Sequence, residues 1–158
     1  VERARISRPK ISGIIWWNLL DGWPQMSDAI VDYYFTKKLA FDYIKRAQAP
    51  FAVVAGEIES WNLPLFACND TLCKMSGTLS VIDVDTDETV FESEFCVPEN
   101  CTKKIGQFPV FFSEKKMFLI KWETPDGIGF NHYTAGNVPL DFDTYKNWLE
   151  KLNNYIKM

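Results

Sequence analysis

The chain lacks a long hydrophobic run, an excess of basic residues and a signal-like N-terminus. No apolar stretch approaches the roughly 20 residues that a membrane span needs, so we expect no membrane partner. With 17 Lys and Arg against 21 Asp and Glu, the formal net charge is −4, which argues against a nucleic-acid partner. The first residues show neither an initiator Met nor an apolar signal core. This favours an internal piece of a longer, cytoplasmic protein over a secreted one.

Histidine and cysteine, the usual ligands of transition metals, are scarce. The four cysteines form two pairs, Cys68 with Cys73 and Cys96 with Cys101, and four residues separate the members of each pair. Zinc-binding turns commonly have two residues between their cysteines. Cys68 and Cys96 also lie in apolar, strand-like runs, where cysteine is an ordinary buried residue. We therefore expect no metal and no cofactor, and the pattern leaves free thiols and a disulfide as alternatives.

Aromatic residues, in contrast, are abundant. Six Trp, six Tyr and 12 Phe make up 15% of the 158 residues, and 47% of the chain is hydrophobic. This composition predicts a folded protein with one good core, or one domain plus a fragment of another. It also fits a protein that handles carbohydrate, because sugar rings stack on aromatic faces.

The apolar periodicity changes at Pro50. Residues 36–47 carry an apolar stripe at helical spacing, with Thr36 placed to cap the helix, and Pro50 cannot continue it. We place a domain boundary there, which divides the chain into residues 1–48 and 49–158. Beyond it, short apolar runs separated by turn residues predict strands. The expected strands are 51–58, 62–68, 74–84, 88–97, 103–112, 116–124 and 128–134.

Seven short strands at this spacing predict a mainly β fold, an immunoglobulin-like sandwich. In the run 88–97, the apolar residues Phe91, Phe95 and Val97 alternate with Glu92, Glu94 and Cys96, which indicates one buried and one exposed face. Pro125-Asp126-Gly127 is typical of a hairpin turn. An apolar stripe predicts a C-terminal helix that packs on the sandwich, with Asp141 or Asp143 as its cap. The residues of the stripe are Phe142, Tyr145, Leu149, Leu152 and Ile156, widened by Trp148 and Tyr155.

Residues 13–24 are the most informative stretch for function. Gly13 to Trp16 have the composition of a buried strand, and polar groups then alternate with indoles through Asn18, Asp21 and Trp23. Such a mixture suits a sugar, whose C–H faces stack on aromatic rings while its hydroxyls need hydrogen bonds. On composition alone, an ordinary buried strand followed by a turn remains the alternative.

Two motifs resemble glycoside hydrolase family 2, in particular its β-mannosidase branch. The first is Trp17-Asn18-Leu19-Leu20-Asp21-Gly22-Trp23-Pro24 with Ser27, Val31-Asp32-Tyr33-Tyr34 and Lys38, which is similar to the last barrel strand and its loop. Asn18 and Leu20 differ from that pattern, which leaves the sugar open. The second is Gly129-Phe130-Asn131-His132-Tyr133 with Pro139 and Asp141, which resembles the end of the C-terminal sandwich.

The resemblance implies that the chain is the C-terminal part of a retaining exo-acting β-glycosidase, with a βα remnant of a (β/α)8 barrel before the sandwich. It places both catalytic glutamates on earlier barrel strands, so no catalytic residue is expected in this chain. It implies substrate contacts for Trp17 and Trp23, and hydroxyl contacts or a bracing role for Asn18 and Asp21. His132 lies in the sandwich motif, so we interpret it as a hydrogen-bonded structural residue.

A stand-alone carbohydrate-binding or adhesion module is the alternative function. Such a module would expose aromatic residues on the sandwich itself, for example Trp61, Phe111 and Phe112. The fragment interpretation instead predicts that residues 1–35 lack their natural neighbours. They would then be disordered or pair with a second copy, as a homodimer.

Overall fold

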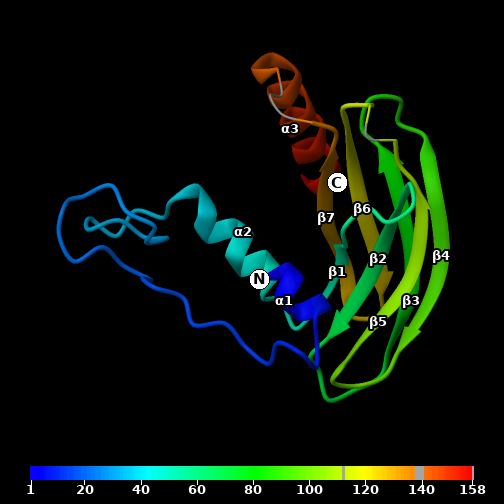
Figure 1. Cartoon of the computed structure of the whole chain (residues 1–158), viewed down its shortest axis with the longest axis horizontal. Helices are drawn as coiled ribbons and strands as arrows, with labels where there is room; N and C mark the ends of the chain where they lie inside the picture. The colour runs from blue at the N-terminus through cyan, green and yellow to red at the C-terminus, as the bar shows by residue number, and fades with distance from the viewer. Residues whose placement is uncertain (112, 138–140, 158) are drawn as a thin grey trace.

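The structure is a two-layer β-sandwich that carries a helix on one face and a long, projecting segment before its first strand (Figure 1). It is a computed structural model that describes every residue except 112, 138–140 and 158, and the side chains of 156 and 157 also lie outside the described part. The elements in chain order are α1 (Glu2–Ile6), α2 (Leu39–Ala47), β1 (Phe51–Ala55), β2 (Asn62–Asn69), β3 (Met75–Asp83), β4 (Thr89–Val97), β5 (Cys101–Pro109), β6 (Lys116–Thr124), β7 (Gly127–Ala135) and α3 (Phe142–Lys157).

The strands form two antiparallel sheets. The order is β1-β2-β5 in the three-stranded sheet and β4-β3-β6-β7 in the four-stranded sheet, with the chain crossing between sheets after β2, after β4 and after β5. Three strands facing four is an immunoglobulin-like arrangement. The expected mainly β sandwich of seven strands with a C-terminal helix is therefore confirmed, and the strand bounds differ from the expected ones by a few residues.

The core lies between the two sheets. Its residues come from the inward positions of the strands, where side chains alternate between core and solvent. In β4, Phe95 and Val97 face the core, whereas Glu92, Glu94 and Cys96 are exposed. The strand register puts Cys96 on the outer face with the glutamates, as the alternation predicts, and not in the core as its apolar surroundings suggested. All four cysteines are free thiols, and the described residues include no group of three or more potential ligands that could hold a metal.

Helix α3 covers the outer face of the four-stranded sheet, as Figure 1 shows beside β6 and β7. Trp148 and Leu152 are buried there, and the Trp148 indole N–H donates to Asp85 Oδ1 at 2.7 Å. The helix begins where Asp141 caps it, because the backbone N–H of Thr144 donates to Asp141 Oδ2 at 2.9 Å. The cap and most of the predicted packing face are confirmed. Phe142 was wrongly assigned to that face, because the first residue of the helix is 66% exposed, and the side chain of Ile156 lies outside the described residues.

Two local expectations before Pro50 were wrong. Gly13 to Trp16 form no strand, and Ile15 is 98% exposed, because no strand in the described part of the chain pairs with them. Helix α2 begins at Leu39 with Lys38 at its N-cap, so Thr36 does not cap it. Thr36 instead closes a turn, since its N–H donates to Asp32 Oδ1 at 2.7 Å.

Residues before the sandwich are ordered in part against it. Helix α1 packs on β2, so the expectation that residues 1–35 are disordered or buried on a second copy does not describe this end of the segment. Nothing tests the domain boundary at residues 48 and 49, which stays a prediction. Among the described residues, no helix is long and apolar enough to cross a membrane.

Candidate functional site on the aromatic segment

The segment of residues 13–38, here called the aromatic segment, holds all four predicted substrate-binding residues. It projects away from the sandwich and returns to it through α2 (Figure 1). Its regular contacts are few: Leu20 forms a parallel bridge with Val31, and Val31 forms an antiparallel bridge with Lys37. Scattered backbone hydrogen bonds, such as that from the Lys38 N–H to the Ile30 carbonyl at 3.0 Å, add to these bridges, and side chains provide further support.

Asp21 provides that support. Its carboxylate is 2% exposed and accepts a short hydrogen bond from Ser27 Oγ, one from Lys38 Nζ at 2.9 Å and one from Gln25 Nε2 at 3.4 Å. The Lys38 ammonium also donates to the Ser27 carbonyl at 3.1 Å. Residues from both ends of the loop and its middle therefore meet at one carboxylate.

The network holds the Asp21 carboxylate in its charged form. The hydrogen bonds from Ser27 and then from Lys38 lower the pKa of Asp21 below its usual value, against the opposing effect of desolvation. Two apolar residues later in the same segment, Ala29 and Ile30, are also buried. At neutral pH, Asp21 is thus an ionised brace inside the aromatic segment.

The indoles of the segment point to solvent. Trp17 is 76% and Trp23 is 65% exposed, and Asn18, joined to Trp17 by a cis peptide bond, is half-buried. The structure thus places two aromatic faces and one amide on an accessible surface, and it places Asp21 beneath that surface. The contacts of Asp21 match bracing more closely than hydroxyl binding. The substrate-binding roles of all four residues stay predictions.

Sequence reasoning assigned no role to several residues that shape this surface. Tyr33, Tyr34 and Phe35 follow the turn at Asp32, and all three rings are exposed. Tyr33 and Tyr34 pack edge to face, with ring centroids 5.3 Å apart. The sequence signal for this exposed group was the run of three consecutive aromatic residues. Aromatic residues that are buried on one face of a helix or strand recur at the period of that element instead.

His132 lies in a cleft between α2 and β7. The cleft has a volume of about 430 Å³, and Trp16, Tyr43 and Arg46 are among its lining residues. The imidazole packs edge-on against the Tyr43 ring at 5.8 Å, and its own backbone N–H donates to Asn131 Oδ1. Burial, and then the nearby Arg46 charge, lower the pKa of His132 to about 4. A neutral, packed imidazole fits a structural residue.

Comparisons with known proteins place these observations in context. No family model matches the chain, and no curated protein matches it. Among solved structures, the chain is similar to the crystal structure of the β-D-mannosidase from Dictyoglomus thermophilum, with a TM-score of 0.72 and 25% sequence identity. The match covers 84% of this chain and 17% of the mannosidase chain. The chain therefore resembles a small portion of a β-mannosidase.

Proposed function

We propose that this chain is the C-terminal part of a retaining, exo-acting β-glycosidase of the family 2 type, which hydrolyses β-mannosides or related β-glycosides. The extent of the match to the β-mannosidase carries the proposal. The residues from Phe51 onward make up only about two thirds of the chain, whereas the match covers 84% of it. At least part of the similarity therefore lies before Phe51, in the N-terminal part of the chain.

In this proposal the chain contributes binding and not bond cleavage. Retaining glycosidases use two carboxyl groups about 5–5.5 Å apart, one as nucleophile and one as acid/base. Both would lie on barrel strands outside this chain. The exposed indole of Trp17 would form the apolar platform of the sugar subsite, and Trp23 the next aromatic wall.

The two polar side chains would have different roles, because one is accessible to solvent and the other is buried. The half-buried Asn18 amide can both donate to and accept from sugar hydroxyls. Asp21 has its oxygens engaged by Ser27 and Lys38, so it would hold the loop that presents the indoles. A preorganised loop costs less ordering entropy when the sugar binds, which favours affinity.

An activity assay on two proteins tests the proposal. This chain alone should leave aryl β-mannoside, β-galactoside and β-glucuronide intact at micromolar protein. Turnover that follows the purified chain through fractionation would contradict it. In the longer protein, Trp17→Ala should lower kcat/KM by about tenfold or more, because it removes an apolar wall worth 1.4 kcal/mol or more. Trp61→Ala, an equally large change at an exposed indole of the sandwich, is the matched control and should leave kcat/KM unchanged.

One observation favours the alternative, a carbohydrate-binding module. Trp61 and Phe111 are both exposed, and they lie at the same end of the three-stranded sheet, where the Val110 N–H donates to the Trp61 carbonyl at 2.9 Å. Phe112, the third residue expected there, lies outside the described residues. Calorimetric titration of this chain with a manno-oligosaccharide distinguishes the two functions. Binding that Trp61→Ala abolishes and Trp17→Ala preserves would support the module.

A further inference from the structure

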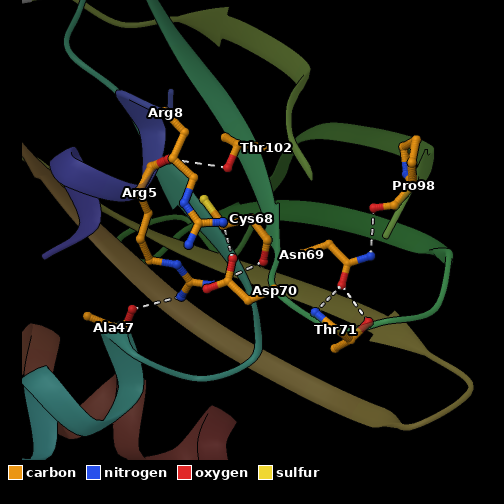
Figure 2. Close-up of polar contacts among 9 residues, drawn as sticks. All are labelled: Arg5, Arg8, Ala47, Cys68, Asn69, Asp70, Thr71, Pro98 and Thr102. Carbon is orange, nitrogen blue, oxygen red and sulfur yellow. Dashed lines mark hydrogen bonds and ion pairs between the residues drawn. The ribbon is translucent and has the colours of Figure 1, made fainter. Parts of the chain in front are cut away.

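A buried arginine joins the two helices that flank the aromatic segment, α1 and α2, to the sandwich. The Arg5 side chain, 8% exposed, extends from α1 and donates from Nη1 to the Ala47 carbonyl at 2.7 Å and from Nη2 to the Cys68 carbonyl at 3.1 Å. Nη2 also lies 3.1 Å from Asp70 Oδ2. Figure 2 shows this guanidinium between the end of α2 and the end of β2.

Arg8, three residues after Arg5 and also before the aromatic segment, completes the arrangement. Its Nη1 donates to Asp70 Oδ1 at 2.6 Å, so one carboxylate receives both arginines (Figure 2). Arg8 lies at the point where the chain departs toward the aromatic segment, and Ala47 lies where it returns. We call Arg5, Arg8 and Asp70, with the carbonyls of Ala47 and Cys68, the Arg5 cluster.

The sandwich side of the Arg5 cluster is held rigidly. The Asp70 N–H donates to the Pro50 carbonyl at 2.8 Å. Its neighbour Asn69 is fully buried, and the Asn69 amide donates to the carbonyls of Cys73 and Pro98 at 2.8 Å each. The hydroxyl of Thr102, on the paired strand β5, donates back to the Arg5 carbonyl at 3.2 Å. Asp70 therefore has a fixed position on the sandwich, and Arg5 and Arg8 attach the chain that flanks the aromatic segment to it.

The energetics favour an orienting role over a stabilising one. The Arg5 Nε is buried and, within the described part of the chain, has no hydrogen-bond partner. A buried charge with an unmatched donor pays a desolvation penalty that its ion pair barely offsets. Apolar residues in place of Arg5 would stabilise this junction equally, but they would not fix α1, the end of α2 and the end of β2 in one geometry. Only the planar guanidinium reaches two carbonyls and a carboxylate together.

We propose that Arg5 is a positioning residue, and that the Arg5 cluster sets the orientation of the aromatic segment relative to the sandwich. The inference deepens the proposed function and rests on it in one respect, namely that the aromatic segment binds sugar. The test of the Arg5 proposal does not measure hydrolysis. The Arg5 proposal can therefore fail while the glycosidase proposal stands, and the glycosidase proposal can fail while the Arg5 proposal stands.

Thiol labelling reports whether the junction opens. Cys68 is buried beneath the Arg5 cluster, whereas Cys73 and Cys96 are exposed and serve as internal references. With peptide-level mass spectrometry after brief N-ethylmaleimide treatment, Arg5→Lys should raise the labelling rate of Cys68 about tenfold or more, because local opening governs access to a buried thiol. Arg3→Lys, on the same helix and paired with Glu57 at the surface, should leave it unchanged.

A distance measurement distinguishes an orienting role of Arg5 from a role that only stabilises the fold. Spin labels at Met26→Cys and native Cys96, in a background with Cys68→Ala, Cys73→Ser and Cys101→Ser, span the aromatic segment and β4. Arg5→Lys should broaden the interspin distance distribution of the folded protein, whereas Arg3→Lys should leave it as in the parent. An unchanged distribution in Arg5→Lys would overturn the proposal, since a contact that only stabilises the fold does not alter the geometry of folded molecules. Equal protection of Cys68 in both variants would overturn it as well.

Discussion

The Lys38 ammonium lies 2.9 Å from the carboxylate of Asp21, although 17 residues separate the two in the sequence. Lys38 is the N-cap of α2, and Asp21 lies at the opposite end of the loop that carries the exposed aromatics. The ion pair therefore couples the start of a helix to the shape of a loop that is otherwise held by isolated bridges and scattered backbone hydrogen bonds.

Replacing Lys38 by Met should loosen the aromatic segment and leave the sandwich intact. The substitution preserves the length of the side chain but leaves the buried Asp21 carboxylate with fewer donors, so the loop opens more often. Hydrogen exchange of peptides from residues 19–38 should accelerate about tenfold or more, while β3 and β6 keep their protection. Lys37→Met is the control at the adjacent position. Equal acceleration in both variants would contradict the role of the Asp21 pair.

The pH dependence of stability should carry a contribution from His132. The folded protein holds this imidazole neutral down to a pKa of about 4, whereas the unfolded chain binds a proton near pH 6.5. Stability contributed by neutral His132 is thus complete above pH 6.5 and falls as the pH drops toward 4, by up to roughly 3 kcal/mol.

His132→Gln should flatten this decline. The measurement is the free energy of unfolding in urea at pH 7 and pH 4.5 for both proteins, with the difference between them isolating His132 from the titrating carboxylates. A parallel decline in the two proteins would be evidence against a strongly lowered pKa.

Helix α3 should contribute substantially to the stability of the sandwich. Trp148 is 2% exposed against the outer sheet face, and its indole N–H bonds Asp85. Trp148→Ala should cost about 3–5 kcal/mol in the free energy of unfolding, because it opens a cavity and leaves Asp85 without that donor. Phe142→Ala, at an exposed position of the same helix, should change the free energy by less than about 0.5 kcal/mol. Guanidinium denaturation of the three proteins provides the comparison.

The β6–β7 hairpin should depend on glycine at position 127. Gly127 has φ +133, a conformation that side chains rarely adopt, although open space surrounds the position of a Cβ. Gly127→Ala should therefore destabilise the fold by about 1 kcal/mol or more through backbone strain alone. Gly13→Ala, where a Cβ also meets open space and no unusual φ occurs, should be close to neutral. Comparing the thermal unfolding midpoints of the two variants distinguishes backbone strain at position 127 from the effect of adding a methyl group.

The sandwich could be predicted from the sequence because its determinants are local and complete within the chain. Alternation in the strands, turn residues such as Asp126 and the stripe of α3 each specify an element whose partners are also present. Cys96 was misjudged because a cysteine next to apolar residues fits either face of a strand, and only the register decides between them.

The aromatic segment was harder to predict because its structure depends on contacts between residues distant in the sequence. Gly13 to Trp16 have a strand's composition, but a strand forms only where another one pairs with it. The helix start shifted from Thr36 because Asp32 binds the Thr36 N–H in a turn. Asp21 was recognised as important, but its bracing by Ser27 and Lys38 requires the folded loop.

The central claim, that this chain is the non-catalytic end of a β-glycosidase, is tested most directly by assaying hydrolysis of an aryl β-mannoside by two proteins. One is this chain alone, and the other is the complete product of the reading frame that contains it. The account predicts that the complete product extends several hundred residues upstream of Val1 and hydrolyses the glycoside, while the chain alone does not. Hydrolysis by the purified chain alone, or an inactive complete product without upstream barrel glutamates, would contradict it.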